Sequence, residues 1–270
     1  MLKDITIGQY FPGKSALHRL DPRIKIILTL AYIILIFFVG NSVGFALSIL
    51  FLGACYLIAK IPLKMILKSL KPIVPILIFT GILNMLFITG DDPFFEWGII
   101  SISSEGIYMA IVTAIRVICL IGASSLLTYT TSPIALTDAI ERLLKPLKYV
   151  KFPVHELAMM MSIALRFIPT LVEETDKIMA AQKARGADLE SGGLMQRAKA
   201  LVPILIPLFI SAFRRAEELA LAMECRCYHG GEGRTRMKQL HLGSADFLAC
   251  GVMAVILCAL IGANFLPIPW

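Results

Sequence analysis

The sequence of 270 residues is 57% hydrophobic and has a mean hydropathy of +0.78, which excludes an ordinary soluble domain and indicates an integral membrane protein. Charged residues still make up 17% of the chain, so they must be segregated from the apolar runs. The net charge of +7 does not indicate nucleic-acid binding, because no basic motif interleaved with aromatic residues accompanies it and a surface facing anionic lipid needs the same excess.

The first 25 residues are polar and mildly basic, and they are expected to form a cytoplasmic N-terminal segment. Residues 8–15, GQYFPGKS, match the phosphate-loop pattern G-x-x-x-x-G-K-S. That loop requires a buried strand before it and a helix after it, whereas Pro22 and an apolar run follow here. We therefore do not expect a nucleotide site at this motif.

Residues 26–130 are expected to hold four transmembrane helices. Residues 26–59 contain no charged side chain, and this length suits two short spans joined by the helix breakers of residues 40–44. Residues 60–71 interleave lysines with Ile, Leu and Met, which predicts a short helix in the cytoplasmic interface. Further apolar runs predict three spans, at about residues 72–88, 107–129 and 245–265.

Lysine and arginine are concentrated in residues 1–25, in residues 60–71 and between Arg142 and Lys238. Residues 245–270 are expected to form a fifth span and a short C-terminal tail, NFLPIPW. The positive-inside rule places the N-terminus in the cytoplasm and this tail outside. Arg116 lies inside the fourth predicted span. A charge at that depth is either shielded within the bundle or has a mechanistic role, and the sequence leaves both interpretations open.

Residues 131–244 are expected to form a cytoplasmic coupling domain of amphipathic helices. Thr131, Ser132 and Pro133 are a helix-start signal, a hydroxyl cap followed by proline in the first turn. Two long helical patterns follow, starting near His155 and Leu194. Each begins apolar and ends charged, and a helix of roughly 30 residues is about 45 Å long. The fold class is therefore all-α, with about five transmembrane helices and two long helices in the coupling domain.

Small residues recur at four-residue intervals along both long patterns. Ala180 and Ala184 follow this spacing in the first, and Ala212, Ala216 and Ala220 follow it in the second. Such stripes let two helix backbones approach closely. We therefore predict that the two long helices cross along these alanines.

Each long pattern ends on an arginine between two small residues, Arg185 between Ala184 and Gly186, and Arg226 between Cys225 and Cys227. One interpretation is an ordinary cation at a helix C-terminus. The other is partner docking, because small neighbours let a guanidinium reach into a groove and bind a carboxylate in a two-pronged geometry. Two such ends in a chain without another soluble domain favour docking.

Other kinds of chemistry find little support. Cys225, Cys227 and His229 are three soft donors, but no fourth ligand is nearby and Arg226 separates the thiols, so no metal site is expected. A self-sufficient carrier or channel needs polar groups at the bilayer midplane, for which only Arg116 is a candidate. An intramembrane enzyme needs paired catalytic groups, and the sequence offers no such pair. Both classes remain as alternatives, and no catalytic residue is assigned.

Four segments of the chain together resemble the sequence pattern of one known family: residues 8–25, 126–148, 164–186 and 210–228. With them the chain resembles the transmembrane T component of energy-coupling factor transporters, a family that also contains the membrane subunits of cobalt and nickel importers. The last two segments hold the family's paired x-Arg-x signatures near the ends of its coupling helices. The first signature has the common Ala-Arg-Gly form, and the second departs from it because both neighbours of Arg226 are cysteines.

The resemblance implies a complex of this scaffold with two ABC-type ATPase subunits and a substrate-binding membrane subunit, the S component. ATP and magnesium would be held by the ATPase subunits, and this chain would be a non-catalytic subunit that binds no cofactor. The ATPase-docking residues would be Ala184, Arg185, Gly186, Cys225, Arg226 and Cys227.

In the family's mechanism, closure of the ATPase dimer moves the two helices and reorients the S component. The apolar halves of the two helices would form the platform on which the S component rests. The platform residues would be Met159, Met160, Met161, Pro169, Pro203 and Pro207. The resemblance implies vitamin uptake across the cell membrane of a prokaryote, with a dedicated cobalt or nickel importer as the alternative.

Overall fold

The computed structural model describes residues 10–88, 93–97, 100–150, 152–187, 193–230 and 240–264. The predicted C-terminal tail beyond residue 264 and most of the polar connection between residues 229 and 244 lie outside these ranges. The described residues fall into two compact units, one within residues 137–239 and one within residues 8–136 and 240–270. We call the first the coupling unit and the second the membrane unit.

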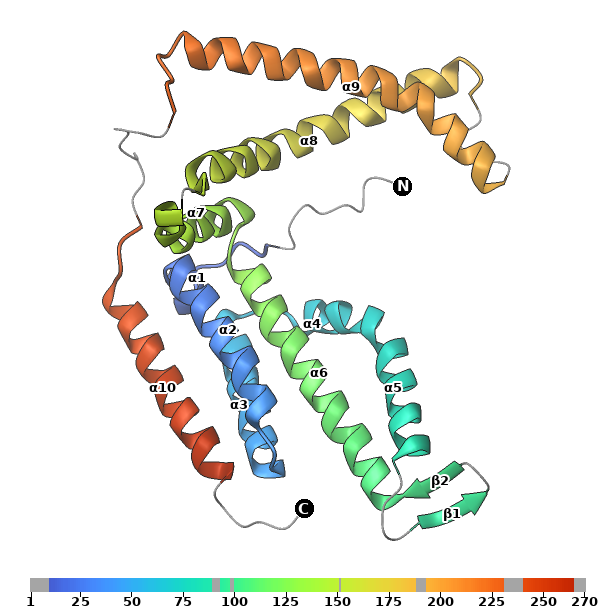
Figure 1. The fold of residues 1–270 in the computed structure, drawn as a ribbon, viewed down its shortest axis with the longest axis vertical. Helices are drawn as coiled ribbons and strands as arrows, with labels where there is room; N and C mark the ends of the chain where they lie inside the picture. Colours follow the sequence, from blue (N-terminus) through green and yellow to red (C-terminus); the bar gives the residue numbers. More distant parts are fainter. Residues whose placement is uncertain are drawn as a thin grey trace. The chain divides into compact units, whose positions relative to one another are not determined.

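The membrane unit is a helical bundle that also contains one short hairpin (Figure 1). Its helices are α1 (Ala16–Arg19), α2 (Pro22–Phe38), α3 (Ser42–Ala59), α4 (Leu63–Leu70), α5 (Val74–Phe87), α6 (Ser104–Thr130) and α10 (Ser244–Asn264). A 3-10 turn, Lys71–Ile73, joins α4 to α5. Strands β1 (Pro93–Trp97) and β2 (Ile100–Ser103) pair antiparallel between α5 and α6.

In the described chain, five segments are long and apolar enough to cross a membrane: Ser42–Ala59, Leu63–Phe87, Ser104–Thr130, Val154–Ala184 and Ser244–Ala263. Ser42–Ala59, Ser104–Thr130 and Ser244–Ala263 coincide with predicted spans. Leu63–Phe87 contains the predicted span of residues 72–88 together with part of the predicted interfacial helix, and Val154–Ala184 was predicted as a helix of the coupling domain. The predicted first span is α2, whose 17 residues give about 25 Å, at the lower limit for crossing the hydrocarbon layer. The all-α, multi-pass prediction is thus confirmed, apart from the unpredicted hairpin.

A core of apolar side chains holds α2, α3, α6 and α10 together. Its buried members come from all four helices: Tyr32, Leu35, Ile36, Val39, Phe45, Val112, Cys119, Ala123, Met253 and Leu260. The opposite face of α2 exposes Ile27, Leu30, Ile34 and Phe37, which are spaced by three or four residues. Since an exposed apolar stripe of this width is unfavourable in water, this face suits lipid.

A buried polar cluster joins the first helix of the bundle to the last. Asp246 accepts backbone hydrogen bonds from Asp21 (2.8 Å) and Gly243 (2.8 Å). Asp21 caps α2 by accepting from the Arg23 backbone (2.9 Å), and it pairs with the Arg23 guanidinium (2.7 Å), which also donates to the carbonyl oxygen of Leu240 (3.3 Å). Because buried carboxylates are costly without partners, this cluster fixes the start of α10 against the start of α2.

The hairpin leads into α6 at a close approach between α5 and α6. The Ser103 hydroxyl accepts from the Gly106 backbone (3.1 Å) and donates to the carbonyl oxygen of Ile88 (2.9 Å). A Cβ added at Gly106 would lie 3.1 Å from the carbonyl oxygen of Asn84. Glycine therefore lets the two backbones pack this closely, because a larger residue would make a tight contact with α5.

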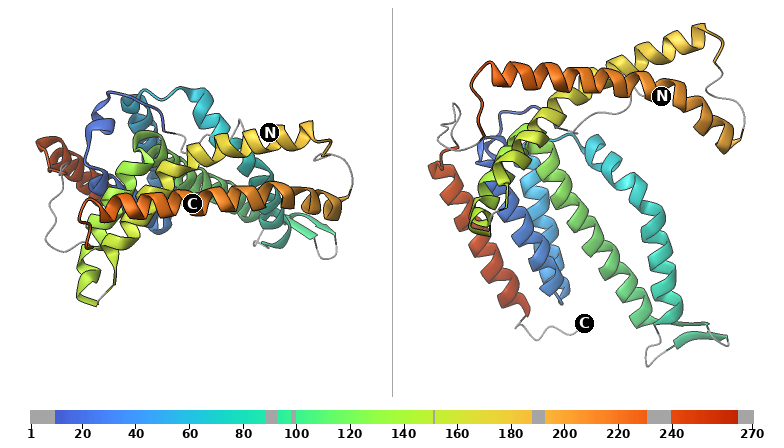
Figure 2. Two further views of the ribbon diagram at one scale, coloured as in Figure 1. Left: turned by 90° about the horizontal axis from the view of Figure 1, so that it is seen from above. Right: turned by 45° about the horizontal axis from the view of Figure 1, so that its top comes forward.

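The coupling unit consists of helices and a 3-10 turn. Helix α7 (Pro133–Leu144) begins in the last residues of the membrane unit and continues into the coupling unit. As predicted, it starts at the proline, and the Ser132 hydroxyl accepts from the Ala135 backbone (3.3 Å). The 3-10 turn Lys145–Val150 follows, and then the long helices α8 (Val154–Ala184) and α9 (Leu194–Glu224), which cross (Figures 1 and 2).

Candidate functional site

Helix α8 ends in a backbone motif that favours a glycine directly after Arg185. The Gly186 N–H donates to the carbonyl oxygen of Lys183 (3.0 Å), and the Ala187 N–H reaches back to that of Gln182 (3.0 Å). Gly186 has a φ of +84°. This pair of bonds around a left-handed residue is the Schellman motif, with Arg185 as the last residue before the turn.

Helix α9 ends in the same motif around Arg226. The Cys227 N–H donates to the carbonyl oxygen of Glu224 (2.9 Å), and the Tyr228 N–H donates to that of Met223 (3.0 Å). Cys227 has a φ of +55°, so it occupies the place that Gly186 has at the end of α8. Arg226 therefore stands at the same position of its turn as Arg185, although the sequences around the two arginines differ. We call residues 184–186 and 225–227 the first and the second tip.

The shared turn changes the interpretation of the residue that follows each arginine. A Cβ added at Gly186 would meet no other atom within 4 Å, so glycine is favoured there by its backbone angle and not by lack of space within the chain. All residues of the two triplets, Ala184, Arg185, Gly186, Cys225, Arg226 and Cys227, are exposed. Each turn thus presents one guanidinium at the negative end of a helix dipole, with only small side chains beside it.

Because Cys227 adopts a left-handed conformation, Cys227→Gly is expected to stabilise the second tip by about 1 kcal/mol. Hydrogen exchange of the amides of residues 227 and 228 should then slow about fivefold, and Cys227→Val should make it faster. Cys225→Ala is the matched control, since Cys225 has ordinary helical angles. Equal exchange in all of these variants would show that the turn does not depend on residue 227.

Polar contacts hold the crossing of α8 and α9. The Glu174 carboxylate accepts a short hydrogen bond from the Ser211 hydroxyl and pairs with the Arg215 guanidinium (2.8 Å). The Glu174 and Arg215 side chains are 22% and 36% exposed, so the pair is only partly screened by solvent. We call these three residues the crossing junction.

A second contact lies nearer the tip of α8. Pro207 has no N–H, so the carbonyl oxygen of Pro203 has no donor four residues further along α9. The side-chain amide of Gln182 donates to this oxygen (3.3 Å). The proline that weakens α9 locally thus creates an acceptor that α8 uses.

The predicted crossing is confirmed, but the bonds that hold it do not involve the alanine stripes. Ala212 is half-buried, whereas Ala180, Ala216 and Ala220 are exposed within the chain. The more buried side of α9 follows another row: Ile204, Leu208, Ser211, Arg215 and Leu219. Because neighbouring helix positions differ by about 100°, Ala216 and Ala220 fall just outside this row.

The tips and the crossing junction are evenly spaced. Glu174 precedes Arg185 by eleven residues, and Arg215 precedes Arg226 by eleven residues. Eleven residues are close to three helical turns and about 16 Å, so each arginine lies on nearly the same face of its helix as its junction residue. The two helices therefore have arms of equal length beyond the junction.

The expected platform residues are accessible in the chain. Met160 and Met161 are 59% and 38% exposed, Pro169 is exposed, and Met159 is half-buried. On α9, Pro203 and Pro207 are exposed, together with apolar side chains that form one broad face: Leu201, Val202, Leu205, Ile206, Phe209, Ile210 and Phe213. An apolar face of this size is typical of a surface that contacts lipid or another protein.

Arg116, whose role the sequence left open, lies in α6, and its side chain reaches the end of α2. Its guanidinium donates to the carbonyl oxygen of Val39 (3.2 Å), which follows the last residue of α2, and it lies 5.5 Å from the ring centre of Phe45. A cation is favourable at a helix C-terminus and over an aromatic face. These contacts give Arg116 a structural role in the α2–α3 connection.

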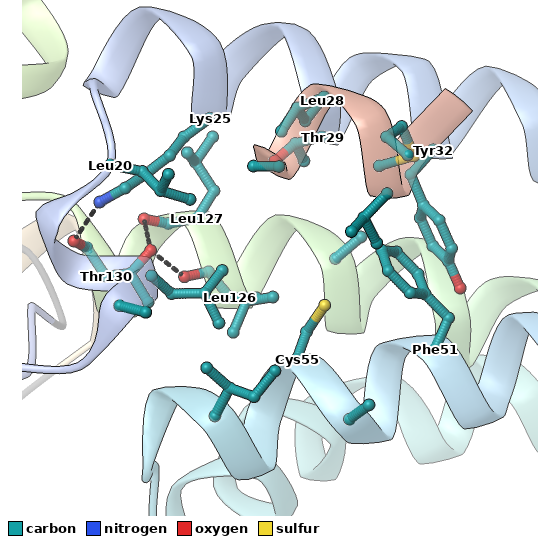
Figure 3. A pocket seen from close by; sticks show the side chains of 18 of the residues that line it. Leu20, Lys25, Leu28, Thr29, Tyr32, Phe51, Cys55, Leu126, Leu127 and Thr130 are labelled. Atoms are coloured by element: carbon teal, nitrogen blue, oxygen red, sulfur yellow. Dashed lines mark hydrogen bonds between the residues drawn. The ribbon is translucent and has the colours of Figure 1, made fainter. Parts of the chain in front are cut away.

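A cavity of about 330 Å³ lies among α1, α2, α3, α6 and α10 and is lined mainly by apolar side chains (Figure 3). The Lys25 ammonium at its edge donates to the carbonyl oxygens of His18 (3.3 Å) and Thr130 (2.9 Å) and to the Thr131 hydroxyl (3.4 Å). The Tyr32 hydroxyl donates to the carbonyl oxygen of Ser48 (3.0 Å). Since these donors are engaged within the protein, the cavity is poorly suited to a hydrophilic transport substrate.

Among the described residues, no group of three or more His, Cys, Asp and Glu side chains is arranged to hold a metal ion, and this includes Cys225, Cys227 and His229. The crossing junction was not predicted from the sequence. Its signal is weak, because Glu174 and Arg215 are ordinary charged residues of two amphipathic helices.

The sequence was compared with known proteins. The family model described as CbiQ, cobalt transport protein, matches residues 13–237. The chain is 58% identical over 257 residues to the energy-coupling factor transporter transmembrane protein EcfT of Ruminiclostridium cellulolyticum, covering 95% of this chain and 96% of the relative. It is 56% identical over 260 residues to the protein of that name from Clostridium kluyveri, covering 96% of each.

A similar match, 47% identical over 261 residues, is found with EcfT of Bacillus subtilis and covers 97% of this chain and 98% of the relative. These relatives are named as transmembrane components of a transporter, which agrees with the five apolar segments of the structure. The chain belongs to the CbiQ/EcfT family of transporter membrane components.

Proposed function

We propose that this chain is the scaffold of an energy-coupling factor importer in the cell membrane of a prokaryote, with its N-terminus in the cytoplasm. Two ABC-type ATPase subunits dock at Arg185 and Arg226, and an S component rests on the apolar halves of α8 and α9. ATP and magnesium bind the ATPase subunits, and this chain has no catalytic role. Closure of the ATPase dimer moves the two helices and reorients the S component to deliver a vitamin.

The observation that carries the proposal is the repetition of one helix-ending turn with an arginine at the same place. Two ATPase subunits of one family offer two similar grooves, and two equivalent turns suit such a pair. An arginine in such a turn can pair with a groove carboxylate through two parallel N–H bonds. The neighbouring small residues leave the guanidinium free to enter.

The crossing junction supplies the mechanical link. If the tips moved independently, displacement of one helix would not reach the other. Glu174 joins the two helices through Ser211 and Arg215, and Glu174 and Arg215 each precede the arginine at the end of their own helix by eleven residues. Motion of either tip is thereby transmitted to the apolar faces on the far side of the junction.

A dedicated cobalt or nickel importer is the alternative, since the matching family model is described as a cobalt transport protein. The named relatives instead favour the energy-coupling factor type. In either case the S component selects the substrate, so a vitamin or a metal ion would bind a different polypeptide. Radiolabelled vitamin and Co²⁺ uptake with the cognate S component separates the two candidates.

Co-purification tests the proposed complex. The tagged chain, extracted in mild detergent, is expected to retain two different or identical ATPase subunits in equal amounts and one S component. Stain intensity corrected for mass measures the ratio. A chain that transports substrate after purification without any ATPase subunit would be a self-sufficient carrier and would contradict the proposal.

A further inference from the structure

Helix α4 and the residues that flank it carry a row of lysines, the α4 row, which the proposed coupling mechanism does not use. Lys60, Lys64, Lys68 and Lys71 follow at intervals of three and four residues, and all are exposed. The sequence contains no Asp or Glu between Pro22 and Gly90. The row therefore has no acidic neighbours along the chain with which it could form ion pairs. Its positive charge is available to an anionic partner.

The other side of α4 is attached to the membrane unit. Met65 and Ile66 pack against a buried cluster that contains Tyr56 and Tyr129. The Tyr129 hydroxyl donates to the carbonyl oxygen of Met65 (3.1 Å). Because α6 holds α4 by this face, the orientation of the lysine row is fixed.

The exposed side of α4 also carries leucines beside the lysines. Leu63 and Leu67 are 75% and 66% exposed, and they form a row adjacent to Lys64 and Lys68. Figure 1 shows α4 turned away from the axis of α5, which follows the 3-10 turn Lys71–Ile73. The possible span Leu63–Phe87 is divided by this turn, and α5 alone has 14 residues, or about 21 Å, which is most of the thickness of the apolar layer. The C-terminal end of α4 therefore lies near the edge of that layer.

Lys60 provides an independent observation at the start of the row. It has a φ of +56°, and its N–H donates to the carbonyl oxygen of Leu57 (3.1 Å) at the end of α3. Glycine fits this left-handed position with about 1 kcal/mol less strain. The chain thus carries a strained lysine where a glycine would suffice for the turn.

We propose that the α4 row is a binding site for the headgroups of anionic phospholipids. The ammonium groups of Lys64, Lys68 and Lys71 donate to phosphodiester oxygens, and Lys60 adds charge at the end of the row. Leu63 and Leu67 insert among the upper acyl carbons, as in helices that lie in the membrane interface. Two of the four lysines lie on the amphipathic helix α4 and the other two flank it, which makes a basic cluster of the size that recognises anionic headgroups; the ligand supplies both the negative charge and the apolar layer.

The test uses the purified full chain in detergent at about 0.15 M salt. Native mass spectrometry measures binding of dioleoylphosphatidylglycerol and, as the zwitterionic comparison, dioleoylphosphatidylcholine. The combined variant Lys64→Gln, Lys68→Gln, Lys71→Gln is expected to bind phosphatidylglycerol on the order of 100-fold more weakly, with phosphatidylcholine binding unchanged. The variant with arginine at the same three positions should retain the affinity.

A matched control removes three exposed lysines elsewhere, at Lys14, Lys177 and Lys199, and should bind phosphatidylglycerol like the unmodified chain. Circular dichroism checks that each variant keeps its helices. Equal loss in this control, or no loss in the α4 variant, overturns the proposal. Displacement of the lipid by millimolar inorganic phosphate would show a site for free phosphate, and loss of a protein partner with lipid binding intact would show an acidic protein surface; either result also overturns it.

Discussion

Replacing Arg185 and Arg226 together by glutamate is expected to abolish transport and to prevent co-purification of the ATPase subunits. Each substitution places a carboxylate opposite the carboxylate of the partner groove. Losing one member of a buried charge pair costs about 2–5 kcal/mol of binding free energy. With two tips affected, association should weaken by at least about 1,000-fold. Pull-down of the complex and uptake of radiolabelled substrate measure the two effects.

The corresponding double lysine variant is the control for charge. Lysine retains the positive charge but cannot form two parallel bonds with a carboxylate, so association should weaken on the order of 10-fold per tip. Both variants should insert into the membrane normally, because the triplets are exposed and lie in the coupling unit. Normal uptake by the double glutamate variant would reject the docking role of these arginines.

Glu174→Arg is expected to separate docking from coupling. It removes the acceptor for Ser211 and Arg215 and brings two cations together, which weakens the junction on the order of 2 kcal/mol. The tips remain intact, so the ATPase subunits should still co-purify and hydrolyse ATP. Substrate uptake should fall about 10-fold or more, because the two helices no longer move together.

The charge swap provides the decisive control for this prediction. The double variant Glu174→Arg, Arg215→Glu restores an opposite pair across the crossing and should recover much of the uptake. Recovery would distinguish a role of the pair from general damage to either helix. Full uptake in the single variant would mean that the junction does not transmit the motion.

The membrane spans could be predicted because apolar runs, lysine distribution and helix breakers are local features of the sequence. The first connection illustrates this, since the breakers of residues 40–44 correspond to the end of α2 and the start of α3. The β1–β2 hairpin was missed. Its segment contains Pro93, Glu96 and Gly98, which weaken the alternation that marks a strand, and it reads as a loop.

The sequence predicted that the two long helices end near Arg185 and Arg226, but it did not explain the residues that follow these arginines. Glycine after Arg185 signals a helix end, whereas cysteine after Arg226 carries no such signal. Only the backbone angle of Cys227 reveals that both helices end in one motif. The cysteines of the second signature therefore occupy positions of a known turn, and their small size remains compatible with docking.

The contacts at the crossing of α8 and α9 could not be predicted from the sequence. Alanine stripes report how closely two backbones can approach, but they do not show which rows face each other. The contacts that hold α8 to α9 join residues about forty positions apart, from Glu174 to Ser211 and Arg215. The acceptor of the Arg116 guanidinium, the carbonyl oxygen of Val39, was hidden for the same reason.

The most direct measurement is a structure of the assembled transporter with both ATPase subunits and the S component. Each guanidinium, of Arg185 and of Arg226, should lie in a groove of its own ATPase subunit within hydrogen-bonding distance of a carboxylate, with α8 and α9 still joined at Glu174. An arginine that faces solvent in that assembly, or two helices that have separated at the junction, would contradict the account.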